Sequence, residues 1–160
     1  MLELLVIVVI ISVLSVIGYS SMMDLIFTNH AKETAHVLRT FAEKSIADAK
    51  RQGKPVKISL VSNDIIAYDA NTDEEISRMA LGGGFTGQNV PASPNEGASM
   101  LFNATGARSE FRLGVSGITE QGYFAACGAR GYCGAAVKSA NENSFRAYIK
   151  KGNDAIWEAL

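Results

Sequence analysis

The sequence predicts an α+β protein, in which one long N-terminal helix packs on an antiparallel β-sheet head. Two observations lead to this prediction. An uncharged run, followed by a polar and apolar pattern of helical period, occupies the chain up to Arg51. After Pro55 the pattern changes to an alternation of apolar and polar residues, which is typical of half-buried strands. The chain has 160 residues and a net charge of -1, so we expect one small head domain without an overall basic field.

The opening run predicts a membrane-spanning helix over residues 1–25. No charged residue lies between Leu4 and Met23. About 20 residues at 1.5 Å rise extend about 30 Å, which is the hydrocarbon thickness of a bilayer. The alternative is a cleaved secretory signal, but such a signal has a basic leading end and a shorter apolar core, whereas Glu3 is acidic. The apolar residues that we assign to the span are Leu4, Leu5, Val6, Ile7, Val8, Val9, Ile10, Ile11, Val13, Leu14, Val16 and Ile17.

The helix is expected to continue over residues 26–52 as an amphipathic segment. Its small or apolar positions step by three and four, which places them on one face of a helix of period 3.6. These positions are Ala31, Ala35, Leu38, Ala42, Ser45, Ile46 and Ala49. Gly53 and Pro55 then supply a stop signal. Residues 53–160 are left to form the β-rich head.

The head is predicted to consist of antiparallel strands. Residues 56–61 and 65–69, separated by a Ser-Asn-Asp turn, read as a first hairpin. A glycine- and proline-rich loop is expected over residues 82–97, because its composition has little capacity for a core. The further expected strands are 98–103 and 109–115, which form a second hairpin, and 123–127, 135–138 and 144–151.

Motifs for catalysis, metal binding or cofactor binding are not found in the sequence. His30 and His36 fall on different helical faces, which does not suit shared metal ligation, and both precede the sheet. Gly82 opens a triple glycine, but neither the lysine nor the following helix of a phosphate-binding loop is present. We therefore predict a protein that is not an enzyme and that has no cofactor and no metal site.

The only two cysteines, Cys127 and Cys133, enclose the sequence GARGY. A zinc site would need further ligands, so a disulfide that closes a tight loop and two reduced thiols remain as alternatives. A close cysteine pair in a small domain suits an oxidising compartment. The positive-inside rule points the other way, because Lys32, Arg39 and Lys44 follow the span and no basic residue precedes it.

The stretch LELLVIVVIISVLSVIGY resembles the N-terminal segment of type IV pilins and of the pseudopilins of type II secretion systems. In that family a prepilin peptidase removes a basic leader that ends in glycine. Glu3 falls on the glutamate of the family, which is thought to pair with the N-terminal amine of a neighbouring subunit in the filament. This sequence has no leader and no Phe-Thr pair ahead of Met1, so we expect the true N-terminus to lie upstream of it.

Within that superfamily, ETAHVLRTFAEKSIADAKRQGKPVKISLV and the later MLFNATG resemble the GspH/FimT group of minor pseudopilins and minor pilins. The resemblance implies a pilin-like fold and a single-pass protein of the bacterial inner membrane with an extracytoplasmic head. It also implies assembly with other pilins or pseudopilins into a pseudopilus or pilus.

Two alternative functions stay open. Some FimT-type minor pilins bind DNA through a basic C-terminal segment, and the corresponding candidates here are Arg130, Arg146, Lys150 and Lys151. The glycine- and arginine-rich pattern of that segment is missing, and acidic residues follow at once, so a solvated strand is the competing interpretation. The other alternative is a signal-anchored extracytoplasmic domain that does not polymerise.

Overall fold

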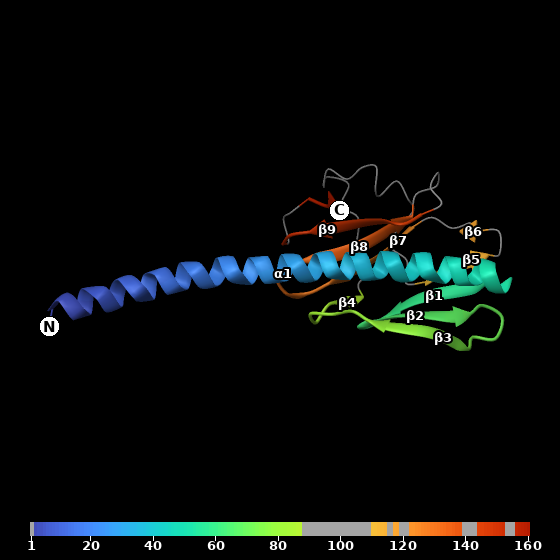
Figure 1. Cartoon of the computed structure of the whole chain (residues 1–160), viewed down its shortest axis with the longest axis horizontal. Coiled ribbons are helices and arrows are strands. Elements are labelled where there is room, and N and C mark those ends of the chain that lie inside the picture. The colour runs from blue at the N-terminus through green and yellow to red at the C-terminus, as the bar shows by residue number, and fades with distance from the viewer. Residues whose placement is uncertain (1, 88–109, 115–116, 119–121, 139–143, 153–155) are drawn as a thin grey trace.

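A computed structural model shows one long helix with a β-sheet head around its C-terminal half (Figure 1). The structure describes residues 2–87, 110–114, 117–118, 122–138, 144–152 and 156–160. The N-terminal half of the helix projects from the head, and the C-terminus lies in the head (Figure 1). The predicted α+β class is therefore confirmed as a long N-terminal helix packed against antiparallel sheets.

Helix α1 (Leu2–Gln52) runs through both of the segments that the sequence separates by composition. Proline is absent from it, and Gly18 is its one glycine, so nothing in the segment breaks the backbone hydrogen bonding. The helix ends because Gly53 adopts a left-handed conformation with φ of 66°, and the amide of Lys54 donates to the carbonyl of Ala49 at 3.2 Å.

The first sheet has the strand order β3-β2-β1-β5-β6. Its members are β1 (Val56–Val61), β2 (Asp64–Asp69), β3 (Glu75–Ala80), β5 (Glu110–Gly114) and β6 (Gly117–Ile118). The predicted first hairpin is present, and its register pairs Val56 with Asp69 and Val61 with Asp64. Strand β3 was not predicted. Its side chains are mostly exposed, so it lacks the apolar alternation by which strands are recognised.

The second sheet has the order β10-β9-β8-β7-β4. Its members are β4 (Thr86–Gly87), β7 (Gly122–Cys127), β8 (Cys133–Lys138), β9 (Arg146–Lys150) and β10 (Glu158–Ala159). The 3-10 turn η1 (Ala129–Gly131) connects β7 to β8.

Several predicted boundaries are wrong in this region. Strand β8 begins at Cys133 rather than at residue 135, because it pairs with β7 from the cysteine pair onward. Strand β9 is shorter than the predicted 144–151. The predicted loop 82–97 contains β4, since Thr86 and Gly87 pair with Cys127 and Ala126. The predicted strand 98–103 lies outside the described residues, and β5 pairs with β1 and β6.

The main core lies between α1 and both sheets. Helix α1 packs chiefly on β8 and β9 of the second sheet and also contacts β1. The predicted apolar helix face is the buried face. Its members Ala31, Ala35, Leu38, Ala42, Ser45, Ile46 and Ala49 are all buried, together with Thr34 and Phe41. A second cluster, which includes Tyr123, Val137 and Trp157, lies on the other face of the second sheet.

Candidate membrane and assembly surface

The N-terminal half of α1 is an exposed apolar rod. Every described side chain from Glu3 to Met22 is exposed, and the exposed fractions of Leu5 and Val16 reach 67% and 72%. The most apolar window of 18 residues in α1 has a mean hydropathy of 2.5 and buries none of its residues inside the molecule. Within the described part of the chain, this one helix is long and apolar enough to cross a membrane. Eleven of the twelve residues that the sequence assigns to the span are exposed, and the side chain of Ile17 lies outside the description.

The polar side chains of the rod turn back onto its own backbone. The Ser12 hydroxyl donates to the carbonyl of Val9 at 2.8 Å, and the Ser15 hydroxyl donates to the carbonyl of Ile11 at 2.7 Å. Such bonds satisfy hydroxyl groups that would otherwise be unpaired in hydrocarbon. Nothing lies within 4 Å of the position that a Cβ atom on Gly18 would occupy, so the head leaves this part of the rod uncovered.

Glu3 lies in the first turn of α1 and is exposed. An acidic side chain in the first turn is favoured by the partial positive charge of the helix N-terminus. The described head packs on the other half of the helix, so Glu3 lies on the exposed part of α1. A carboxylate in this position can accept hydrogen bonds from an ammonium group or pair with it.

The head is seated on the helix through a close backbone contact. A Cβ atom on Gly134 of β8 would lie 2.5 Å from the carbonyl oxygen of Ala31 and 2.7 Å from the amide nitrogen of Ala35. Only glycine fits at such a distance. The small side chains of Ala31 and Ala35 allow the strand to approach the helix this closely. Gly134 lies one residue ahead of the predicted strand 135–138, so this close approach was not expected from the sequence.

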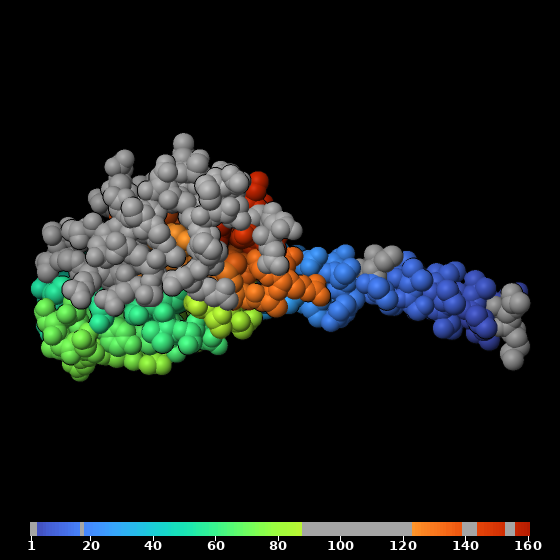
Figure 2. Space-filling model, turned by 180° about the vertical axis from the view of Figure 1, so that it is seen from behind, coloured from blue at the N-terminus to red at the C-terminus, as the bar shows by residue number. Residues whose placement is uncertain are grey.

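The cysteine loop reaches the helix where the rod leaves the head. Cys127 and Cys133 form a disulfide, which is one of the two states that the sequence left open. The two residues are opposite each other in the register of β7 and β8, and they close the loop that contains η1. Figure 2 shows residues 123–138, in orange, against the helix at the end of the head that faces the rod.

Arg130, at the tip of this loop, contacts helix α1 through charge and through an aromatic ring. Its Nη1 lies 3.5 Å from Oδ1 of Asp24, and its guanidinium carbon lies 5.7 Å from the ring centroid of Phe27. Phe27 stacks on Tyr132 of the same loop with a centroid distance of 5.6 Å. Burial raises the pKa of the Tyr132 hydroxyl, and the negative charge of Asp24 raises it further.

A glycine turn contacts the helix close to the cysteine loop. Gly83 has a φ of 66°, and a Cβ atom there would lie 2.7 Å from the His30 ring. The His30 ring in turn lies 3.6 Å from a carboxylate oxygen of Glu33. Phe85, which follows the turn, is fully buried and would be 2.8 Å from a Cβ atom on Gly128. The cysteine loop and the glycine turn therefore contact each other and the same stretch of helix.

The four basic residues that the sequence proposes for DNA contact lie in different surroundings. Arg130 pairs with Asp24, and Lys151 pairs with Glu158 at 2.7 Å. Lys150 is buried, with 8% of its surface exposed, whereas Arg146 is exposed at the other end of β9. The structure thus does not gather these four side chains into one exposed basic patch.

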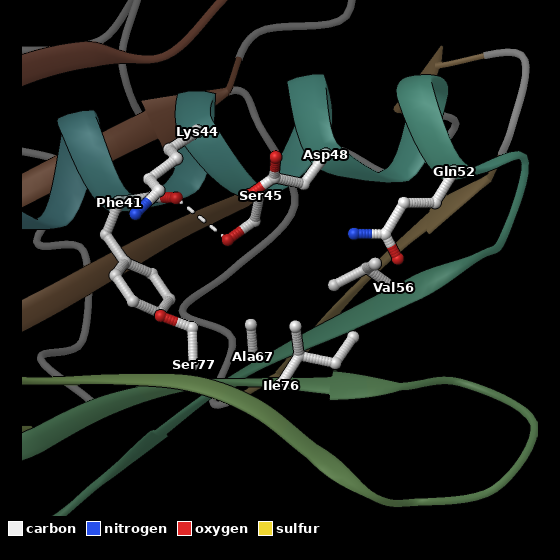
Figure 3. A pocket seen from close by; sticks show the side chains of 9 residues that line it. All are labelled: Phe41, Lys44, Ser45, Asp48, Gln52, Val56, Ala67, Ile76 and Ser77. Atoms are coloured by element: carbon white, nitrogen blue, oxygen red, sulfur yellow. Dashed lines mark hydrogen bonds between the residues drawn. The ribbon is translucent and has the colours of Figure 1, made fainter.

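The described residues contain no group of three or more histidine, cysteine or acidic side chains that could hold a metal ion. His36 is exposed on α1, away from the glycine turn that His30 contacts. Both cysteines are used in the disulfide. A small groove lies between the last turns of α1 and strands β2 and β3 (Figure 3). Its lining residues are Phe41, Lys44, Ser45, Asp48, Gln52, Val56, Ala67, Ile76 and Ser77, and the Ser45 hydroxyl donates to the Phe41 carbonyl at 2.9 Å.

Taken together, the fold and the exposed rod define an α+β chain with one helix able to cross a membrane and a disulfide-containing head. No protein-family model matches the chain, and neither a curated protein nor a solved structure shows a significant match.

Proposed function

We propose that this protein is a minor pilin-like structural subunit, which is anchored in the bacterial inner membrane by the N-terminal half of α1. The observation that carries the proposal is the division of one continuous helix into an exposed apolar half and a half that is buried in the head. A bilayer and a bundle of like helices are two environments that cover such a rod. A subunit that moves from the first to the second is a filament subunit that polymerises through its helix.

Glu3 gives the proposed assembly its register. A carboxylate in a bundle of apolar helices is costly unless an opposite charge meets it. An N-terminal amine of a neighbouring subunit would meet it at one axial offset only, because any other offset leaves both charges unpaired. Glu3 thus favours one arrangement of subunits, while the apolar side chains supply the contact area.

The disulfide supports an extracytoplasmic position of the head. Disulfides persist in oxidising compartments such as the periplasm and are rare in the cytosol. This argument outweighs the three basic residues that follow the span, because folded domains translocate largely regardless of such charges. The head then presents its surface to neighbouring subunits outside the membrane, and the proposed role is structural rather than catalytic.

The experiment that tests the proposal replaces Glu3 in the full chain. Glu3→Leu is expected to leave membrane insertion intact, as measured by resistance to carbonate extraction, and to lower co-purification with other pilins or pseudopilins. Glu33→Leu is the matched control, because Glu33 is an exposed acidic residue on the same helix within the head. Equal co-purification of the Glu3→Leu variant and the unmodified chain would contradict the assembly role of Glu3.

A further inference from the structure

We propose that the cysteine loop, residues 128–132, is a docking surface for phospholipid headgroups. It would hold the base of the head against the bilayer, with Arg130 as the group that contacts lipid phosphate. This inference rests on the membrane span of the proposed function, and it adds a lipid partner for the head.

The cysteine loop lies at the depth of the lipid headgroups. If the uncharged run from Leu4 to Met23 fills the hydrocarbon core of about 30 Å, Asp24 lies at its edge. Phe27 lies three residues further along the helix, or about 4.5 Å beyond that edge. The headgroup layer adds about 5 to 7 Å on each side of the hydrocarbon. Arg130 contacts both Asp24 and Phe27, so its guanidinium lies at the level of the lipid phosphates.

The side chains of the loop have the chemistry of a lipid–water interface. Arginine stems extend along apolar surface while the charge stays at the interface. Tyr132 stacks on Phe27, and the guanidinium of Arg130 lies over the Phe27 ring. A guanidinium is also the side-chain group best suited to bind phosphate with two parallel hydrogen bonds.

Arg130 is accessible and is held in a rigid loop. Its side chain is 54% exposed although its Nη1 contacts Asp24. Arg130 has a left-handed backbone with φ of 59°, within a loop that the disulfide closes. The loop therefore presents the guanidinium in a defined place, and less entropy is lost when a lipid phosphate binds.

Asp24 has a part in the same surface. Its carboxylate would disfavour an anionic lipid if it were unpaired, and Arg130 offsets that charge at the point where the helix enters the bilayer. Exchange of the Asp24 contact for a phosphate contact keeps the arginine paired in both states. Lys151, which follows β9 near this end of the head, is already paired with Glu158 and is not needed for the proposal.

The test uses tryptophan fluorescence in the full chain, reconstituted into vesicles of phosphatidylglycerol and phosphatidylcholine in equal amounts. Ala129→Trp places an indole on the exposed tip of the loop, and Asn71→Trp places one on the exposed β2–β3 turn. That turn lies beside Pro55, at the far end of α1 from Asp24. Lipids brominated near the headgroup end of the acyl chain are the quencher, and the parent protein corrects for Trp157.

We expect the tryptophan at position 129 to be quenched and the one at position 71 to be unaffected. Adding Arg130→Gln should lower the equilibrium constant for contact with the anionic surface about fivefold, as read from the loss of quenching at position 129. Arg78→Gln is the matched control, because Arg78 is 52% exposed, is paired with carboxylates and lies on β3. It should leave the quenching at position 129 unchanged.

The outcomes separate this inference from the proposed function. If the protein floats with the vesicles but the two tryptophans are quenched equally, the headgroup contact is refuted while the membrane span stands. Quenching at position 129 that is insensitive to Arg130→Gln refutes the role of Arg130. If the protein does not float with the vesicles, the membrane span fails, and this inference fails with it.

Discussion

The two halves of helix α1 have the same secondary structure and opposite surroundings. In the projecting half, large aliphatic side chains such as Leu5 and Val16 are exposed, and no described residue of the head packs on Gly18. In the half within the head, the closest contacts involve small residues, because Ala31 and Ala35 face Gly134. Bulky aliphatic residues thus occupy the half of the helix that the described head leaves exposed. Small residues serve where a sheet of the same chain approaches closely.

The largest effect is expected from a change at the contact between Gly134 of β8 and helix α1. Gly134→Ala places a methyl group 2.5 Å from the Ala31 carbonyl, so backbone must move, and we expect a loss of about 3 kcal/mol in the free energy of unfolding. Gly18→Ala is the control in the other half, where no described atom beyond the adjacent helix backbone lies within 4 Å of the added methyl group. Thermal unfolding of both variants in detergent measures the contrast, and equal stability would contradict the close contact.

A contrast of comparable size is expected for two leucines of the same helix. Leu38 is fully buried and Leu14 is 63% exposed. Leu38→Ala should cost about 2 to 5 kcal/mol through lost burial and a residual cavity. Leu14→Ala should leave the unfolding midpoint of the head unchanged in detergent, because that side chain contributes nothing to the core. A fall of similar size for both variants would mean that the rod packs on the head.

Removal of the disulfide tests the boundary between the exposed and the buried half of α1. Replacement of Cys127 and Cys133 by serine should destabilise the head by about 2 kcal/mol, because a short closed loop is released in the unfolded chain. Amide hydrogen exchange in α1 should rise near Asp24 and Phe27, which the loop contacts, more than near Leu38. Uniform exchange along the helix would show that the loop does not hold that end.

The smallest expected effect is the pH dependence that Tyr132 adds. Burial and the charge of Asp24 raise the pKa of its hydroxyl above the unfolded value of 10.0. The neutral form is favoured in the folded head, so this stabilisation is complete below pH 10 and is lost as the pH rises through the folded pKa. Tyr132→Phe should therefore flatten the decline in unfolding free energy between pH 9 and 12. Tyr123, whose pKa burial also raises, stays in place as the internal reference.

An unchanged alkaline decline in the Tyr132→Phe variant would assign the effect to Tyr123 or to other groups. The unfolding free energies of the Tyr132→Phe variant and of the unmodified chain are measured with urea at each pH. The difference between these two values is the quantity that is interpreted. Ionic strength is kept constant, because the contribution of Asp24 is electrostatic and is screened by salt.

Local pattern was sufficient for part of the fold. The buried helix face was predicted from spacing alone, because a helix of period 3.6 aligns Ala31, Ala35 and Leu38 whatever covers them. The first hairpin followed from two alternating runs and a turn. Strand β3 was not predicted, because its exposed side chains lack an apolar alternation and only its pairing with β2 makes it a strand.

The junction between rod and head had no local signature. Arg130 and Asp24 are 106 residues apart, and neither residue is unusual in its own segment. The cysteine spacing indicated a tight loop but not the part of the molecule on which that loop would lie. The end of the uncharged run at Met23 could be read from the sequence, whereas the presence of an aromatic and cationic loop beside Asp24 could not.

Local sequence patterns were enough to predict the long helix, its apolar first half, its end before Gly53 and the β-rich character of the head. These features depend on residues within a few turns or within one hairpin, so composition and spacing are enough. Only the tertiary structure decided that β8 touches the helix backbone through Gly134 and that the cysteine loop lies at Asp24. Those contacts join distant segments, and they exist because the sheets must bury one face of the helix at a single position along its axis.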